Sequence, residues 1–128
     1  MFNSTGAFAD VEAQYLALTQ ELSELGPLYL HLLDHSAMGA PPVPAEFKLH
    51  VREAFKGLFI LAGGFDRAGA QSALKAGQAD LIAFARPFLA NPDLVKRMQT
   101  NAPLNAVDMA TFYTPGPKGY SDYPALAA

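Results

Sequence analysis

Three short apolar runs alternate with amphipathic segments along this chain, and no hairpin turn motif joins one run directly to the next. The runs lie at 28–33, 58–62 and 81–85. Strands that alternate with helices form a parallel sheet, because a parallel connection has to cross back over the sheet before the next strand begins. The alternation therefore predicts an α/β fold built from parallel βα units, with its apolar strands buried.

Helical periodicity and helix-ending residues predict four helices, at 11–25, 46–55, 68–76 and 94–98. The first ends at Gly26-Pro27, a glycine cap followed by a helix breaker. Asp66 is the expected N-cap of the third helix, and Asn91 is the expected N-cap of the fourth. Prolines predict a loop over 35–44, and the prolines and glycines after 101 predict a long tail without regular structure.

The length of the chain limits its architecture. With 128 residues it forms one domain at most, and it is short for a complete barrel of eight βα units, which takes about 250 residues. We expect a single partial-barrel domain over 1–128, with an N-terminal helix in 1–26, three βα units in 27–100 and a C-terminal loop or tail in 101–128.

Composition and charge exclude several classes of protein. Hydrophobic residues make up 51% of the chain and charged residues 16%, which is not the composition of a disordered segment. The net charge of -3 provides no basic field for nucleic acid. There is no cysteine, so a disulfide framework and a thiolate metal site are both excluded. The N-terminus lacks a targeting pattern and no apolar run is long enough to span a membrane, so we expect a soluble, cytoplasmic protein.

Small residues follow two of the predicted strands. Ala62-Gly63-Gly64 closes the second strand, and Ala85-Arg86 closes the third. Backbone NH groups at the carboxyl ends of neighbouring parallel strands can converge on one anion, small residues allow the anion to approach, and an arginine adds fixed charge. Glycine after a strand also serves packing alone. By themselves, these junctions indicate either a phosphate site or a packing requirement.

Six segments in order along the chain carry more specific motifs: Tyr29–Pro41, Leu61–Asp66, Gly77–Leu94, Ala102–Asn105, Thr111–Tyr113 and Gly119–Pro124. Together they resemble the C-terminal part of the old yellow enzyme family. The resemblance implies strands six to eight of a (β/α)8 TIM barrel, preceded by one helix. It also implies an FMN oxidoreductase that takes hydride from NADPH or NADH and delivers it to the β-carbon of activated alkenes such as enones.

Carried over by motif, the resemblance assigns roles to six residues. Gly63 and Gly64 after strand seven, and Ala85 and Arg86 after strand eight, would hold the FMN phosphate. Two more residues would lie near the flavin and the substrate pocket, Phe112 and Tyr113.

Two departures from the family pattern stand out. The family usually has Gly-Arg where this chain has Ala85-Arg86, and a positive φ at that position would make alanine costly. The pair of donors that binds the substrate carbonyl in the family, two histidines or a histidine and an asparagine, is missing, as is the tyrosine that donates a proton. No catalytic residue is therefore expected within this chain.

Other polar residues have plainer interpretations. His31 lies in an apolar strand and is expected to be a packed, hydrogen-bonded core histidine. With His35 and His50 it forms no ligand set, so no metal site is expected. Asp34 follows a strand and is expected to be a loop cap or a solvated acid. The alternative to an anion-binding role for Arg86 is an ion pair with an acid such as Asp80.

The remaining singled-out residues lie toward the C-terminus. The Lys96-Arg97 pair is expected to be solvated helix surface near a helix C-terminus. Tyr120 and Tyr123 are expected to anchor the tail rather than to take part in catalysis.

Two functions of different class remain open at the level of sequence. In the first, the chain is a component of an FMN oxidoreductase, inactive alone and needing the rest of the barrel. In the second, it is a non-catalytic fragment or assembly module. Three parallel strands leave two open sheet edges and one uncovered face, so we expect a complementing chain or self-association in either case.

Overall fold

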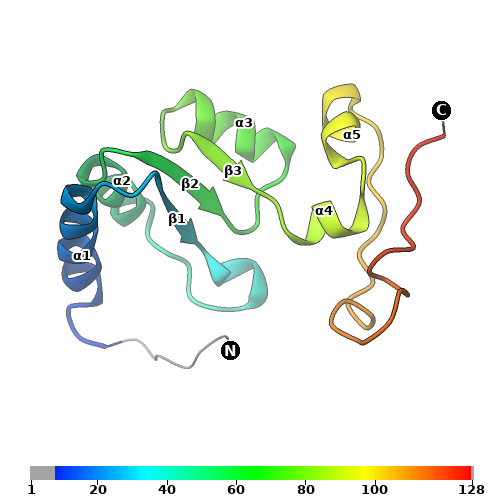
Figure 1. Ribbon diagram of the computed structural model, residues 1–128, viewed down its shortest axis with the longest axis horizontal. Coiled ribbons are helices and arrows are strands. Elements are labelled where there is room, and N and C mark those ends of the chain that lie inside the picture. Colours follow the sequence, from blue (N-terminus) through cyan, green and yellow to red (C-terminus); the bar gives the residue numbers. More distant parts are fainter. Residues whose placement is uncertain (1–7, 128) are drawn as a thin grey trace. The chain divides into compact units, whose positions relative to one another are not determined.

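The computed structural model describes residues 8–127. These residues form two compact units, one ending at Ala83 and the other beginning at Phe84. The first contains α1(Val11–Leu25), β1(Tyr29–Leu33), a 3₁₀ turn (His35–Met38), α2(Ala45–Ala54), β2(Leu58–Ala62), α3(Arg67–Lys75) and β3(Leu81–Ala83). The second contains α4(Arg86–Ala90) and α5(Leu94–Thr100). Figure 1 shows the strands and helices alternating along the chain.

The three strands form a parallel sheet in the order β1-β2-β3. β1 pairs with β2 from Tyr29 beside Leu58 to Leu33 beside Ala62. β2 pairs with β3 from Ile60 beside Leu81 onward. The spatial order equals the sequence order, so each crossover helix moves the chain one strand further in the same direction. The expected parallel α/β arrangement is confirmed.

The core of the first unit lies between one face of the sheet and the helices. Its buried cluster consists of Phe47, Val51, Phe59, Leu61 and Ala79. Leu30 and Leu32 of β1 pack against this cluster, and so does Leu16 of α1. Phe59 is fully buried, and burial of such a side chain contributes about 1.5–3 kcal/mol. Alternate residues of each strand therefore face the helices.

The opposite face of the sheet is exposed. Tyr29, Leu58 and Leu81 lie on this face, and 53%, 43% and 50% of their surfaces are exposed, respectively. Burial of β1 on both faces was predicted and is wrong, because its residues alternate between exposed and half-buried. The prediction that His31 is a packed core residue is also wrong, since His31 is exposed on the same face as Tyr29.

Local end signals act largely as the sequence predicts. Gly26 ends α1 with φ 71° and donates its NH to the Leu22 carbonyl. The Asp66 carboxylate caps α3 by accepting from the Gly69 NH at 2.7 Å. The segment 35–44 was expected to be a loop throughout, but Asp34 caps a short 3₁₀ turn at its start. A single turn of this kind has too few residues to produce a periodic pattern.

The chain from β3 onward departs further from the sequence prediction. The third strand was expected over 81–85 but ends at Ala83, and a short helix, α4, follows from Arg86. Asp93 rather than Asn91 is the N-cap of α5, and its side chain makes no capping hydrogen bond. The Asn91 side chain instead donates to the Pro87 carbonyl and accepts from the Asn105 NH.

Arg97 organises the tail of the second unit. The prediction of a solvated surface pair is wrong for this residue, which is only 4% exposed, although Lys96 is exposed. The Arg97 guanidinium donates to the Asp93 carboxylate at 2.6 Å and to the carbonyls of Pro103 and Pro124 at 2.6 and 2.9 Å. Within the described residues, 101–127 contain no helix or strand, as predicted, and these bonds hold the tail against α5.

Candidate functional site

The turn after β2 is built around two glycines in the left-handed region. Gly63 has φ 114° and Gly64 has φ 67°. A Cβ on Gly63 would lie 2.0 Å from the carbonyl oxygen of Asp34, so only glycine fits there. Gly64 is exposed, and among residues 8–127 its backbone NH donates no hydrogen bond. Gly63 thus has a packing role, whereas Gly64 presents backbone to solvent.

Asp34 stabilises the carboxyl end of β1 beside this turn. Its backbone NH donates to the Ala62 carbonyl. Asp34 is only 5% exposed. Its carboxylate accepts hydrogen bonds from the NH groups of Ser36 at 2.9 Å and Val43 at 3.3 Å. It also accepts one from the Lys48 ammonium at 2.5 Å. Of the two roles predicted for Asp34, the loop cap is confirmed and the solvated acid is wrong.

The pKa of Asp34 reflects these contacts. Burial by itself would raise this pKa, but hydrogen bonds from Lys48 and Ser36, together with the charge of Lys48, outweigh burial and lower the pKa from 3.8 to about 2. Because Lys48 neutralises the carboxylate, Asp34 does not add an unpaired negative charge beside the Gly63-Gly64 turn.

The second predicted junction follows β3 directly along the chain. Ala85 is exposed and has φ -96°, so alanine carries no backbone strain at this position. Arg86 is half-buried. The alternative partner considered for Arg86, Asp80, instead accepts a hydrogen bond from Arg52 at 3.0 Å and one from the Phe59 NH at 2.7 Å.

The two aromatic residues predicted near the flavin pocket lie side by side in the tail. Phe112 is 8% exposed, whereas Tyr113 is 69% exposed. Their rings meet edge to face, with centroids 5.0 Å apart. Tyr123 accepts a hydrogen bond from the Asp108 NH, in agreement with its predicted anchoring role, and Tyr120 is exposed.

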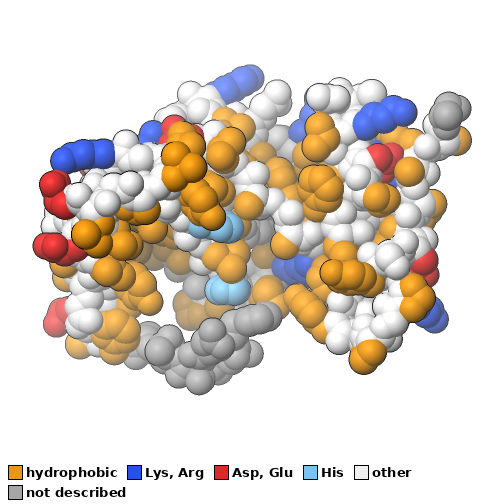
Figure 2. All heavy atoms as spheres, viewed as in Figure 1, with side chains coloured by type: hydrophobic (Ala, Val, Ile, Leu, Met, Phe, Trp, Pro, Cys, Tyr) orange, Lys and Arg blue, Asp and Glu red, His pale blue; other side chains and the backbone are white. Residues whose placement is uncertain are grey.

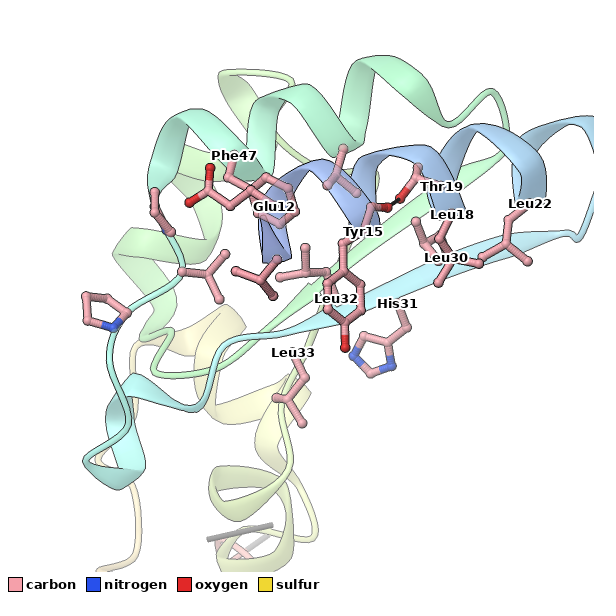
Figure 3. A pocket seen from close by; sticks show the side chains of 15 residues that line it. Glu12, Tyr15, Leu18, Thr19, Leu22, Leu30, His31, Leu32, Leu33 and Phe47 are labelled. Carbon is pink, nitrogen blue, oxygen red and sulfur yellow. Dashed lines mark hydrogen bonds between the residues drawn. The ribbon is translucent and has the colours of Figure 1, made fainter. Parts of the chain in front are cut away.

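A cavity of about 460 Å³ lies between α1 and β1 (Figure 3). Its lining from α1 includes Tyr15 and Leu18, and Figure 3 shows Tyr15 pointing toward β1. Thr19, in the same wall, donates its hydroxyl to the Tyr15 carbonyl at 2.8 Å. Neither Gly63 nor Gly64 lines this cavity. The cavity itself is not predicted by the sequence.

No group of three or more histidine and acidic side chains within 8–127 is arranged to hold a metal ion. None of the helices in the described part of the chain is both long and apolar enough to cross a membrane.

Three parallel strands alternating with helices match part of a TIM barrel, which defines the class of fold. Residues 3–105 match the NADH:flavin oxidoreductase / NADH oxidase family. The chain belongs to this family, that of the old yellow enzymes.

Curated relatives support the assignment. The chain is 45% identical over 118 residues to 12-oxophytodienoate reductase 2 of Arabidopsis thaliana, covering 90% of this chain and 32% of that protein. It is 44% identical to a 12-oxophytodienoate reductase-like protein of Solanum lycopersicum, with 90% and 31% covered. The chain therefore spans about a third of the length of these relatives.

Solved structures of relatives agree in fold. Morphinone reductase superposes with a TM-score of 0.83 at 41% identity, over 90% of this chain and 31% of that one. A variant of NCR from Zymomonas mobilis superposes with a TM-score of 0.82 at 35% identity, over 95% and 40%. Morphinone reductase has also been solved in complex with tetrahydroNAD.

Proposed function

We propose that this chain is the part of an old-yellow-enzyme-type oxidoreductase that holds the phosphate of FMN, corresponding to strands six to eight of the barrel. When bound, FMN would accept hydride from NADPH or NADH and pass it to an activated alkene such as an enone. The proposal rests on membership of the family and on the turn at Gly63 and Gly64.

The chemistry of the Gly64 turn fits a phosphate group. A phosphate needs NH donors that the fold has not already used, and Gly64 supplies an exposed NH and carries no side chain of its own. The two acids closest in sequence to the junctions of β1 and β2 are engaged, Asp34 by Lys48 and Asp66 by the Gly69 NH. Repulsion of an anion is thereby reduced.

The family motif assigns the second half of the proposed site to the junction after β3. β2 and β3 are parallel neighbours, so their carboxyl ends lie at the same edge of the sheet. Ala85 and Arg86 follow β3 within three residues, and the Arg86 guanidinium provides a fixed positive charge suited to phosphate. Phe112 and Tyr113 are proposed to lie near the flavin and the alkene substrate.

Comparison of FMN with riboflavin, which lacks the phosphate, tests this proposal. We expect the chain to bind FMN more tightly than riboflavin, and Arg86→Gln to weaken FMN binding about 10- to 100-fold without changing riboflavin binding, because a charge-assisted hydrogen bond is lost. Lys96→Gln, at an exposed lysine of α5, is the matched control and should leave both affinities unchanged. Equal affinity for the two flavins would overturn the proposed role.

A second candidate, a non-catalytic assembly module, is favoured by the exposed apolar face of the sheet. The two candidates differ in activity after the remainder of the family fold has been supplied. NADPH-dependent reduction of an enone by the reconstituted protein supports the oxidoreductase, whereas flavin-free, inactive assembly supports the module.

A further inference from the structure

Asp34 is held by three parts of the first unit at the point where β1 ends. Its backbone NH donates to the Ala62 carbonyl of β2 at 2.9 Å. Its carboxylate accepts from the NH groups of Ser36 and Val43, in the loop after β1, and from the Lys48 ammonium of α2. Because the residue is also buried, the peptide group that follows Asp34 has little freedom to move.

The same peptide group borders the turn at Gly63 and Gly64. The Asp34 carbonyl oxygen would lie 2.0 Å from a Cβ on Gly63, which places this oxygen against the Cα of that glycine. The 3₁₀ turn that Asp34 caps provides the second neighbour, since a Cβ on Gly64 would lie 3.3 Å from the Cβ of Ala37. Both glycines therefore lie against groups whose placement depends on Asp34.

The orientation of the Gly64 peptide group matters for binding an anion. An NH group binds a phosphate oxygen only when its N–H bond points at that oxygen. Gly64 has φ 67° and lacks a Cβ, so many backbone conformations are open to it in a loose turn. Neighbours that are fixed in advance exclude these conformations before a ligand arrives. Donors ordered in this way bind more tightly, because the entropy loss of ordering them is not incurred on binding.

We propose that Asp34 is a positioning residue for anion binding, which fixes the orientation of the Gly64 NH through Lys48 and the 3₁₀ turn. The effect passes through the backbone, because a carboxylate that acted directly on a phosphate would repel it. Lys48 serves this role by anchoring and neutralising the carboxylate. The inference rests on the proposed phosphate site and adds to it two residues from outside the glycine junctions.

Asp34→Asn in the full chain tests this role through the ratio of the riboflavin and FMN dissociation constants, since only FMN carries the phosphate. The variant keeps the size of the side chain and removes the charge that pairs with Lys48. We expect the preference for FMN to fall about tenfold or more, with riboflavin binding unchanged. A direct electrostatic role predicts the opposite sign, because loss of the negative charge would tighten FMN binding. Unchanged or tighter FMN binding would overturn the proposal.

Asp80→Asn is the matched control for an effect on folding alone. The Asp80 carboxylate also joins α2 to the sheet, by accepting from Arg52 at 3.0 Å and from the Phe59 NH at 2.7 Å, but it does so just before β3 rather than at the glycine turn. We expect this variant to be less stable with its preference for FMN unchanged. An equal loss of preference in Asp80→Asn, or equal weakening of both flavins in Asp34→Asn, would exclude a positioning role.

Lys48→Met is the second variant, for use if Asp34→Asn folds poorly. It removes the anchor on α2 but leaves the hydrogen bonds that the Asp34 carboxylate accepts from Ser36 and Val43. Its decisive measurement is backbone NMR relaxation at Gly64 without ligand, which a purely electrostatic effect on the anion would not change. We expect an order parameter of about 0.85 in the unaltered chain and in Asp80→Asn, and about 0.6 in Lys48→Met and Asp34→Asn.

The relaxation measurement also separates failure of this proposal from failure of the phosphate site. A Gly64 that stays rigid in both Lys48→Met and Asp34→Asn would overturn the positioning role, whatever the flavin affinities. A turn that loosens in these variants, in a chain that binds FMN and riboflavin equally, would reject the phosphate site and leave Asp34 as the residue that fixes the turn.

Discussion

Asp34 and Gly63 meet where β1 and β2 end, and each constrains the other. The Asp34 carbonyl occupies the space that a Cβ of residue 63 would need. The Asp34 carboxylate meanwhile ties the end of β1 to Lys48 of α2. One packed contact therefore joins two strand ends and a helix, and it fixes the backbone of the turn in which Gly64 is exposed.

The buried pair makes the stability of the first unit depend on pH in the acid range. The folded-state pKa of Asp34 lies at about 2, below the ordinary value of 3.8, so its contribution is present above about pH 4 and is lost as the pH falls toward 2. The shift corresponds to about 2 kcal/mol. Asp34→Asn should lower the free energy of unfolding by about that amount at pH 7 and by much less near pH 2.

Urea denaturation at both pH values measures this difference. Asp66→Asn is the control, because asparagine also caps helices and the change should cost little at either pH. A loss for Asp34→Asn that is the same at pH 7 and pH 2 would exclude the ionised carboxylate as its cause.

At the scale of the elements, the sequence predicts what local signals specify. The strand at 58–62 and the first helix match the structure, because apolar runs, caps and a terminating glycine act within a few residues. The prediction that Arg97 is solvated is wrong because its burial depends on contacts with Pro103 and with Pro124, which is 27 residues away. The prediction that His31 is a core residue is wrong because an apolar run does not show which face of the strand is covered.

For the candidate site, the sequence indicated the residues more readily than their roles. The positive φ of Gly63 and Gly64 agrees with glycine at both positions, but the close approach of Asp34 comes from 29 residues earlier in the chain. The Asp34–Lys48 pair was not predicted, because no spacing rule relates a strand end to a residue on the following helix.

The tail should loosen when the Arg97 guanidinium is removed. Arg97→Met keeps a long side chain but removes one hydrogen-bond donor from the Asp93 carboxylate and one from each of the Pro103 and Pro124 carbonyls. We expect amide exchange at Asn105 and Leu126 to accelerate at least about tenfold. Lys96→Met, on the exposed side of the same helix, is the control. Unchanged protection at both amides in Arg97→Met would show that the tail is held by other contacts.

At the scale of the whole molecule, many large apolar side chains are exposed to solvent. Figure 2 shows hydrophobic side chains exposed on the visible face. Among the large apolar residues that are at least 40% exposed are Tyr29, Leu33, Leu58 and Leu81 of the sheet. In a complete barrel, inward-pointing residues of this kind fill the interior in layers. The exposure of these four residues is consistent with a chain that spans about a third of the length of its relatives.

Neighbouring residues of β2 separate the two faces of the sheet. Phe59 is fully buried under the helices, whereas Leu58 is 43% exposed on the other face. Phe59→Lys should cost at least about 3 kcal/mol, because a charge would replace a buried aromatic ring, and Leu58→Lys should cost less than about 1 kcal/mol. Urea denaturation measures both values.

Leu58→Lys should also reduce the binding of a hydrophobic dye and the self-association of the chain, because it places a charge in the exposed apolar face of the sheet. If Leu58→Lys unfolds the chain as severely as Phe59→Lys, that face of the sheet is already packed within this chain.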